Sequence, residues 1–497
     1  MNILIICTEK LPVPPVRGGA IQTYIAGALP ALKQKHQITV LGRNDEELPD
    51  DEIQDGVRYV RVEGGLLEVY REHVIQFLQS SSEKYDLIHI FNRPRLVSAV
   101  RELAPDSKIV LSMHNDMFKP EKIDPEEGAA AVRKVDKIIT ISNYIGDTIK
   151  GFFPEAAPKL QTIYSGVDLD RFLPSYSPEA GKLRNRIRKE NNLTSKKVIL
   201  FAGRLSPNKG IDVLIRAIPD LAKKHKDIAL VIMGSKWFSD NSVTDYIAYV
   251  RALAERLPIP VIQTGFVSPD KIHEWFVASD VFVCTSQWQE PLARVHYEAM
   301  AAALPIVTTN RGGNTEVIEP YKNGIVVENP TDTGEFVEHL SYLLSNPKNS
   351  REMGKYGRSL AEKHYTWNRV VNDIAAVWDE IEKFEGQPYE VPTSTEEKTM
   401  VEQNERADLS DEVNEVNTDH SLSKDISDNG YEKERKHLKE WLGEERPEVA
   451  PVKSPVEQRS KKKKTKPTPY HSFDSFMDYR EERRREKREQ KKSKRKR

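Results

Sequence analysis

Short apolar runs alternate with longer amphipathic segments over roughly the first 385 residues of the chain. Runs that are apolar throughout and separated by helical patterns are typical of parallel strands in a sheet covered on both faces. The first series of expected strands covers residues 3–7, 38–41, 57–62, 87–91, 109–113, 138–141 and 161–164. This part of the pattern predicts a doubly wound α/β domain.

A polar, charged stretch at residues 175–196 interrupts the alternation, and a second series follows. Its expected strands cover residues 198–202, 228–233, 261–264, 281–285, 306–309 and 325–327. We therefore expect two Rossmann-like domains, at residues 1–175 and 176–365. Sheets of this kind bind ligands beyond the carboxyl ends of their strands, so the expected site is a cleft that the two domains face.

The alternating pattern ends near residue 387, and the charge balance changes sign along the remainder. Residues 390–430 carry 12 acidic and 3 basic side chains, whereas residues 459–497 carry 18 basic and 6 acidic ones, within a chain of net charge -1. We predict an acidic disordered linker at 387–458 and a disordered basic tail at 459–497. The tail could bind an acidic partner or surface, or could act only as a solubilising segment.

Cysteine content and the chain start indicate a compartment. The two cysteines, Cys7 and Cys284, both lie within apolar strand patterns, which favours burial as free thiols over a disulfide framework. The chain starts directly on a strand pattern, and no apolar run reaches the length that crosses a bilayer. We expect a cytoplasmic, soluble protein, with peripheral association with a surface left open.

Two glycine-containing loops follow expected strands and precede expected helices. Gly18 and Gly19 lie before a helix expected from Ala20, where a ligand can approach the backbone, although a plain turn explains them equally well. Arg204 and Lys209 lie between the strand at 198–202 and a helix expected from residue 210. Two cations at such a junction could hold a diphosphate, or form a solvated basic loop.

A pair of glutamates follows the strand at 281–285. Pro291 suits the first position of a helix, so Glu290 is expected at the helix start and Glu298 about two turns further on. The two carboxylates would then be separated by about 12 Å. That separation suits an extended nucleotide sugar, but two solvated glutamates on an amphipathic helix would show the same spacing.

Other candidate groups are more isolated. A glycine turn and helix start are expected at residues 311–316, and His114 ends the strand at 109–113, where it could donate to a sugar or be a structural histidine. The spacing of histidines, cysteines and carboxylates predicts no metal site. No nucleophile elbow or phosphate-binding P-loop sequence occurs.

Together these motifs resemble the retaining GT-B glycosyltransferases of family four, over roughly residues 1–385. The resemblance rests on Gly18-Gly19, His114, Ser165-Gly-Val-Asp168, the Gly-Arg-x4-Lys-Gly loop at 203–210 and the Glu-x7-Glu motif at 290–298. Within the family, the chain is most similar to spore-coat-associated glycosyltransferases of endospore-forming bacteria. The resemblance also implies that the helical segment 366–386 crosses back to the first domain.

The resemblance implies a role for each motif. Arg204 and Lys209 would hold the donor diphosphate and stabilise charge on the departing nucleotide without a metal or cofactor. Glu298 would bind the ribose hydroxyls, Glu290 the donor sugar, and His114 would lie near the reacting centre. Backbone contacts to the donor are expected at Gly18, Gly19, Leu292, Ala293 and Arg294.

Two departures from the family pattern leave the sugar open: Pro-Leu-Ala follows Glu290 in place of the usual Gly-Phe-Gly, and Ser165 replaces an asparagine. We expect metal-independent, retaining transfer from a uridine or other nucleoside diphosphate sugar, in spore coat or cell-surface glycan assembly. The acceptor could be a glycan, a protein or a small molecule. The alternatives are a structural or assembly protein of the spore surface and a nucleotide-sugar epimerase.

Overall fold

The computed structural model describes residues 1–236 and 242–383. The predictions for the acidic linker at 387–458 and the basic tail at 459–497 therefore lie outside the described residues. Among the helices of the described part, none is both long and apolar enough to span a lipid bilayer.

The first sheet has eight strands in the order β3-β4-β2-β1-β5-β6-β7-β8. All neighbouring pairs are parallel except β3 with β4. The strands are β1 (Asn2–Ile6), β2 (Gln37–Arg43), β3 (Asp51–Gln54), β4 (Val57–Val62), β5 (Leu87–Phe91), β6 (Lys108–Met113), β7 (Lys137–Thr140) and β8 (Leu160–Thr162). The order reverses at β1, so the edge beyond β1 and β5 is a topological switch point.

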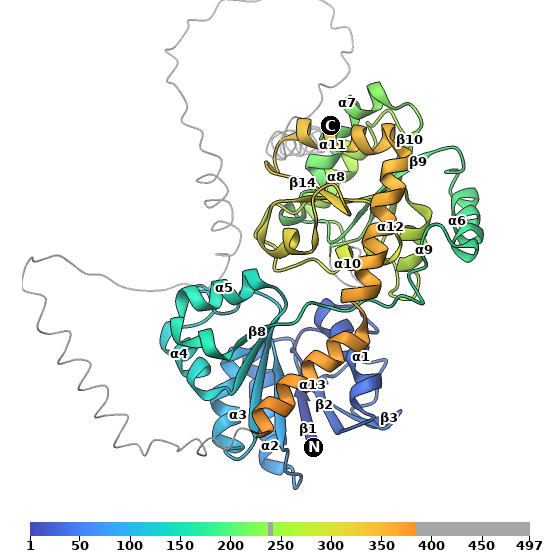
Figure 1. Cartoon of the computed structure of the whole chain (residues 1–497). Helices are drawn as coiled ribbons and strands as arrows, with labels where there is room; N and C mark the ends of the chain where they lie inside the picture. The colour runs from blue at the N-terminus through green and yellow to red at the C-terminus, as the bar shows by residue number, and fades with distance from the viewer. Residues whose placement is uncertain (237–241, 384–497) are drawn as a thin grey trace, which may run out of the picture. The chain divides into compact units, whose positions relative to one another are not determined.

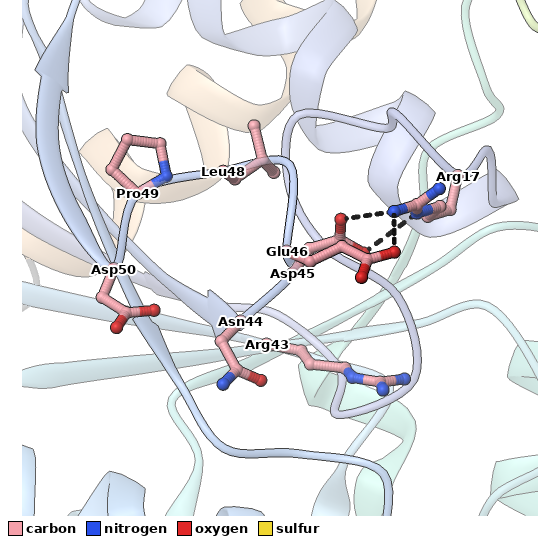
Figure 2. A pocket seen from close by; sticks show the side chains of 8 residues that line it. All are labelled: Arg17, Arg43, Asn44, Asp45, Glu46, Leu48, Pro49 and Asp50. Atoms are coloured by element: carbon pink, nitrogen blue, oxygen red, sulfur yellow. Dashed lines mark hydrogen bonds and ion pairs between the residues drawn. The ribbon is translucent and has the colours of Figure 1, made fainter.

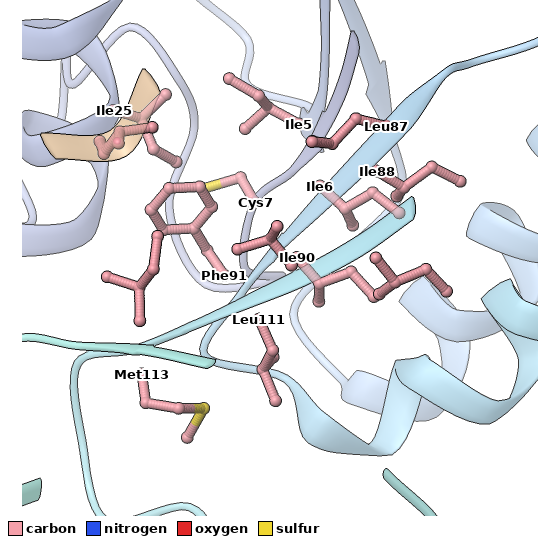
Figure 3. Close-up of a cluster of buried hydrophobic side chains, with 14 of the residues drawn as sticks. Ile5, Ile6, Cys7, Ile25, Leu87, Ile88, Ile90, Phe91, Leu111 and Met113 are labelled. Carbon is pink, nitrogen blue, oxygen red and sulfur yellow. The ribbon is translucent and has the colours of Figure 1, made fainter. Parts of the chain in front are cut away.

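Helices cover this sheet and bury continuous apolar strands. The helices are α1 (Ala20–Leu32), α2 (Leu67–Ser80), α3 (Val97–Leu103), α4 (Pro125–Lys134) and α5 (Asn143–Phe152), with 3-10 turns η1 (Pro94–Leu96) and η2 (Pro154–Lys159). Figure 3 shows side chains of β1, β5 and β6, among them Ile6, Ile90 and Leu111, packed in one cluster with Ile25 of α1. Cys7 belongs to the same cluster as a buried free thiol, as the sequence predicted.

The last described helix, α13 (Trp367–Lys383), packs on the first sheet although it follows the second in sequence. It lies against α1 (Figure 1), and its residues Val370, Ile374 and Trp378 belong to the apolar core of the first sheet. Trp378 is fully buried and its ring meets His89 of β5 edge-on, with ring centroids 5.7 Å apart. Within the described residues, the first core is therefore completed by the last helix, α13.

The second sheet has six strands, all parallel, in the order β11-β10-β9-β12-β13-β14. The strands are β9 (Lys197–Ala202), β10 (Ile228–Met233), β11 (Val261–Gly265), β12 (Val281–Cys284), β13 (Ile306–Thr309) and β14 (Gly324–Val327). The order reverses between β9 and β12, which defines a second switch point. The candidate motifs at 203–210 and 290–298 follow these two strands.

Seven helices and two short 3-10 turns belong to the described residues around this sheet. They are α6 (Pro178–Glu190), η3 (Pro207–Lys209), α7 (Ile211–Lys224), α8 (Asp245–Ala254), α9 (Ile272–Ala278), α10 (Val295–Ala301), η4 (Gly312–Val317), α11 (Thr333–Ser345) and α12 (Pro347–His364). Strong apolar faces of α7 and α11 bury against the strands, which explains why the sequence pattern located this domain.

Two elements escape the apolar pattern. Helix α6 occupies part of the polar stretch at 175–196, begins with a Ser177 side-chain cap, and is held through Arg184 and Arg188, which each pair with Asp280 at 2.5 Å. The short strand β3 is mostly exposed and pairs antiparallel with the edge strand β4. Both elements are specified by polar tertiary contacts, which hydrophobic periodicity does not report.

Replacing Trp378 with alanine should lower the free energy of unfolding of the first sheet unit by about 3 to 5 kcal/mol, because a fully buried aromatic side chain leaves a cavity. Urea unfolding followed by far-UV circular dichroism measures the change. Phe152→Ala in α5 is the matched control, because that ring is 46% exposed and should cost much less. Equal losses in the two variants would contradict the docking of α13 on the core.

Candidate active site

The centre of the candidate site is the carboxylate of Glu290, which accepts three hydrogen bonds at one oxygen. Lys209 Nζ lies 2.5 Å from Glu290 Oε2, Ser286 Oγ lies 2.9 Å away, and Trp288 Nε1 lies 2.8 Å away. Glu290 is only 7% exposed. The two sequence motifs that were predicted to share a site therefore meet through a buried ion pair.

The segment around Glu290 is a loop, so the prediction of a helix starting at Glu290 and Pro291 was wrong. Helix α10 begins at Val295, and the expected 12 Å helical separation from Glu298 does not apply. The Glu290 carbonyl instead accepts from the Gly313 amide at 2.8 Å. This contact with another loop holds residues 290–294 out of helical geometry.

Two glycines make that contact possible. A Cβ on Gly312 would lie 2.1 Å from the Glu290 carbonyl oxygen, and one on Gly313 would lie 2.2 Å from that of Pro291. Gly312 also has a positive φ of 55°. The predicted glycine turn is present, but it opens the 3-10 helix η4 in place of an α-helix.

The loop that carries Arg204 and Lys209 is fixed to neighbouring strands by its backbone. Lys209 O accepts from Thr285 Oγ1 at 2.6 Å at the end of β12. The Gly203 amide donates to Met233 O at 2.9 Å, and a Cβ on Gly234 would lie 1.8 Å from Gly203 O. Helix α7 starts at Ile211, after Gly210 in a left-handed conformation, close to the expected start.

Burial sets the electrostatics of this cluster. Burial alone would raise the pKa of Glu290, but the charge and hydrogen bond of Lys209, with those from Ser286 and Trp288, outweigh it and lower the pKa. Burial lowers the pKa of Arg204, while the Glu290 charge opposes that shift. Lys209 and Arg204 bring two cationic side chains to the cluster, and cationic side chains suit an anionic ligand.

Arg294 and Glu298 form a second polar group at the start of α10. Their side chains lie 3.7 Å apart, and Arg294 Nη1 donates to Ser165 Oγ at 2.8 Å. The Arg294 guanidinium also stacks over the Trp367 ring at 5.7 Å from its centroid. Burial raises the pKa of Glu298, and the nearby Arg294 opposes that shift.

One of the backbone amides predicted to face the donor, that of Ala293, already donates a hydrogen bond within the protein. The Ala293 amide donates to the Asn314 side chain at 3.1 Å and is buried, so contact with a phosphate would first require this bond to break. Leu292 and Ala293 both belong to the apolar cluster on one face of the second sheet. These two side chains therefore shape the loop as core residues.

His114 follows β6 and is enclosed by aromatic rings. Its ring meets Tyr24 edge-on at 4.8 Å and stacks near Phe91 at 5.7 Å between centroids. Burial, followed by the charge of Arg294, lowers the pKa of His114 to about 3. At neutral pH this side chain is an uncharged imidazole, which can donate or accept a hydrogen bond without carrying charge.

A residue that the sequence analysis missed positions His114. Asn92 follows β5 with φ 57°, and its side-chain oxygen accepts from the His114 amide at 3.0 Å and the Asn115 amide at 2.9 Å. Asparagine is among the residues that tolerate this left-handed conformation. The Asn92-Arg-Pro sequence after an apolar strand was the available signal for a tight turn.

Gly18 and Gly19 have positive φ values of 87° and 108°. Helix α1 begins at the next residue, Ala20, as predicted. The adjacent Arg17 lines an open cavity of about 800 Å³ at the carboxyl end of β2. Figure 2 shows the Arg17 guanidinium turned toward Asp45 and Glu46, with Arg43 and Asn44 nearby. The glycine turn thus borders a polar cavity, which sequence periodicity could not reveal.

A buried ion pair was also missed at this edge of the first sheet. Arg93 Nε and Nη2 donate to the two oxygens of Glu9 at 2.5 and 2.8 Å, and both side chains are less than a tenth exposed. The partners are 84 residues apart, so only the parallel pairing of β1 with β5 brings them together. Such a pair fixes the loops that follow both strands.

Within residues 1–236 and 242–383, no group of three or more histidine, cysteine, aspartate or glutamate side chains is arranged to hold a metal ion.

Comparisons with known proteins agree with this architecture. The family described as "Glycosyl transferases group 1" matches residues 184–360, and "Glycosyltransferase Family 4" matches residues 18–171. Spore coat protein SA of Bacillus subtilis is 44% identical over 379 residues, covering 76% of this chain and 99% of that protein. The chain belongs to the GT-B glycosyltransferases. The predicted fold class is confirmed.

The glycosyltransferase is also similar to a second curated protein and to a solved structure. Putative glycosyltransferase YtcC of B. subtilis is 41% identical, covering 77% of this chain and 92% of that protein. The crystal structure of Anabaena HepE in complex with UDP-glucose has a TM-score of 0.60 at 20% identity, over 76% of this chain and all of that one. At this identity the structural likeness supports the shared fold.

Three histidines with lowered pKa values should make the stability of the glycosyltransferase depend on pH. Burial lowers the pKa of His89 and of His114 to about 3 and that of His296 to about 4. Above about pH 6.5 both the folded and unfolded states are neutral at these positions, and no stability is lost. As the pH falls below 6.5, only the unfolded state binds protons, so stability is lost toward pH 3 to 4.

Each histidine should contribute a slope of about 1.4 kcal/mol per pH unit within that window. His89→Gln, which can keep a hydrogen bond to Ser112 Oγ, should reduce the slope near pH 5 by about one such contribution. Urea unfolding at a series of pH values measures the slopes of both proteins. An unchanged slope would show that His89 is protonated in the folded state.

Proposed function

We propose that this glycosyltransferase moves a sugar from a UDP-sugar to an acceptor, with retention at the anomeric carbon and without a metal ion. The observation that carries the proposal is the cluster of Lys209, Arg204 and the buried Glu290 beyond the switch point between β9 and β12. The complex of Anabaena HepE with UDP-glucose, on the same fold, supports uridine as the nucleoside of the donor.

The cluster suits a diphosphate because the Lys209 ammonium can donate more hydrogen bonds than the one that Glu290 accepts. An ammonium carries three N–H groups, and Lys209 donates one to Glu290. The other two can meet phosphate oxygens without displacing the ion pair. Arg204 adds a planar fork of donors, which suits phosphate geometry. Charge that develops on the leaving diphosphate would be stabilised by groups already fixed before reaction.

In the proposed step, the bond between the anomeric carbon and the β-phosphate oxygen breaks, and its electron pair moves to the leaving UDP. The acceptor oxygen forms its bond to the same face of that carbon, and its proton passes to a departing diphosphate oxygen. Glu290 is a poor candidate for a covalent nucleophile, because Lys209 and the other hydrogen-bond donors lower the pKa of the whole carboxyl and so reduce its basicity. Positioning and electrostatic stabilisation would supply most of the rate.

Three further groups would position the donor. Glu298 would accept hydrogen bonds from the ribose hydroxyls, with Arg294 beside it to keep the carboxylate ionised. His114, neutral at physiological pH, would donate to a sugar hydroxyl near the reacting centre. Glu290 would meet the sugar through Oε1, because the protein donors converge on Oε2.

The biological setting that we propose is glycan assembly at the spore coat or cell surface. The name of the B. subtilis relative, a spore coat protein that is 44% identical to this chain, supports this setting. A purely structural coat protein is the second candidate. The partly buried cations Lys209 and Arg204 beside the buried Glu290 favour catalysis, because desolvating an ion cluster without a use costs energy.

Binding of UDP should be independent of divalent metal. Titration calorimetry in the presence of EDTA should give the same affinity as titration in magnesium or manganese, because protein cations would neutralise the diphosphate. Strict dependence on either metal would contradict the assignment of Lys209 and Arg204.

Lys209→Ala and Arg204→Ala should each lower the transfer rate on the order of a hundredfold or more, because each removes a preorganised donor to developing charge. UDP release from the best-bound member of a UDP-sugar panel measures the rate. Lys223→Ala is the matched control, since Lys223 lies on the exposed face of α7 with 76% side-chain exposure. Wild-type rates in both site variants, with thermal melts intact, would refute the clamp.

Glu298→Ala should act mainly on nucleotide affinity, because its proposed contact is with the ribose in both the ground and transition states. Calorimetric titration should show that the variant binds UDP more weakly than the wild type does. Ribose phosphates that lack the uracil base should also bind the variant more weakly. An unchanged UDP affinity would remove the ribose role from Glu298.

A further inference from the structure

A groove on the second sheet unit shares no lining residue with the cluster around Glu290. It lies between α11, α12 and the turn before β14, and has a volume of about 530 Å³. That volume lies within the range of small-molecule sites. Its lining residues are Tyr321, Lys322, Tyr342, Asn349, Glu352, Met353, Lys355 and Tyr356. The groove is therefore aromatic and polar together.

Tyr321 occupies a conformation that a tyrosine seldom adopts. Its φ is 59°, in the left-handed region, and its side chain is 58% exposed. Its amide donates to Gly324 O at 2.8 Å, which closes the turn. A glycine or asparagine would form this turn with less strain. Strain of this kind persists at positions where the side chain has a use.

A second exposed ring continues the surface. Tyr342 of α11 is 37% exposed and meets Tyr321 at 86° between ring planes, with centroids 6.1 Å apart. In an edge-to-face pair only one face of one ring is covered by the other. The Tyr342 hydroxyl accepts from Asn349 Nδ2 at 3.3 Å, which orients this ring from the neighbouring helix α12.

The charged side chains around the rings balance one another. Lys322 pairs with Glu319 at 2.9 Å, and Lys355 pairs with Glu352 at 3.0 Å. The hydroxyl of Tyr356 donates to Glu319 at 2.9 Å, and the Lys322 ammonium lies 5.8 Å from the Tyr356 ring centroid. The groove thus carries hydrogen-bonding groups of both kinds but no net charge from these pairs.

We propose that this groove is a binding site for a neutral oligosaccharide, separate from the donor site. A pyranose ring has apolar C–H groups on its faces and hydroxyls around its edge. Exposed tyrosine rings suit the faces, and paired lysine and glutamate side chains with Asn349 suit the hydroxyls. The balanced charge argues against an anionic ligand such as nucleic acid or an acidic peptide.

The site would hold a glycan chain by a part remote from the reacting end, which raises its local concentration near the enzyme. The proposal does not depend on the identity of the donor sugar or on turnover, because it concerns binding alone. Loss of transfer in the Lys209 and Arg204 variants should leave this site intact.

Maltohexaose and chitohexaose are suitable probes, titrated into the full chain by calorimetry and followed by intrinsic fluorescence. At least one should bind saturably at millimolar or lower concentration. Tyr321→Gly and Tyr342→Ala should each weaken that binding at least tenfold. Tyr176→Ala is the matched control, because Tyr176 is 56% exposed but lies outside the groove.

Tyr321→Gly also separates a binding role from a folding role. Glycine adopts the left-handed conformation without strain, so the melting temperature of this variant should equal or exceed that of the wild type. Weaker binding together with undiminished stability supports the proposal. Absence of saturable binding to both probes, or binding that survives both substitutions, overturns it. A wild-type dimer in sedimentation that dissociates in Tyr321→Gly would assign the groove to a second copy and likewise overturn it.

Discussion

The arrangement of the candidate site depends on the ion pair between Lys209 and Glu290. Burial favours the neutral form of Glu290, and the charge and hydrogen bond of Lys209 outweigh that effect, so the pKa of this carboxyl is lowered and it stays ionised. The pair joins the loop after β9 to the loop after β12, on either side of the point where the strand order reverses. Ser286 and Trp288 complete the set of donors and leave the carboxylate a single orientation.

Close backbone contacts at glycines hold the two loops that carry this ion pair. The glycine turn at 312–313 presses its backbone on the carbonyls of Glu290 and Pro291, at separations that no side chain would permit. Gly234 does the same at Gly203, one residue before Arg204. Charge placement in the site is therefore controlled by glycines that carry no chemistry of their own, and any residue larger than glycine would move a charged loop.

The sequence predicted most of the fold because the fold is built from continuous apolar strands. The sequence prediction missed two elements that polar contacts hold. Strand β3 is short and exposed, and helix α6 is anchored by two arginines that pair with Asp280. The helix expected at Glu290 failed for a related reason, since the Glu290 carbonyl is taken by the Gly313 amide of a distant loop. The pair of Glu9 with Arg93 is specified by strand order, which local sequence does not contain. Lys209 and Glu290, which the motifs assign to one site, lie in contact because both follow strand ends that the sheet order brings together.

The docking of α13 on the first sheet makes that unit discontinuous in sequence, with consequences during synthesis. The strands of the first sheet are complete once Thr162 has been made, yet Trp378 and its neighbours, which cover part of the same core, follow about two hundred residues later. At typical translation rates of about 5 to 20 residues per second, this core waits on the order of ten to forty seconds for α13. During that interval the second unit emerges and can fold first. A nascent chain that stalls between the two events exposes an apolar surface that chaperones would have to cover.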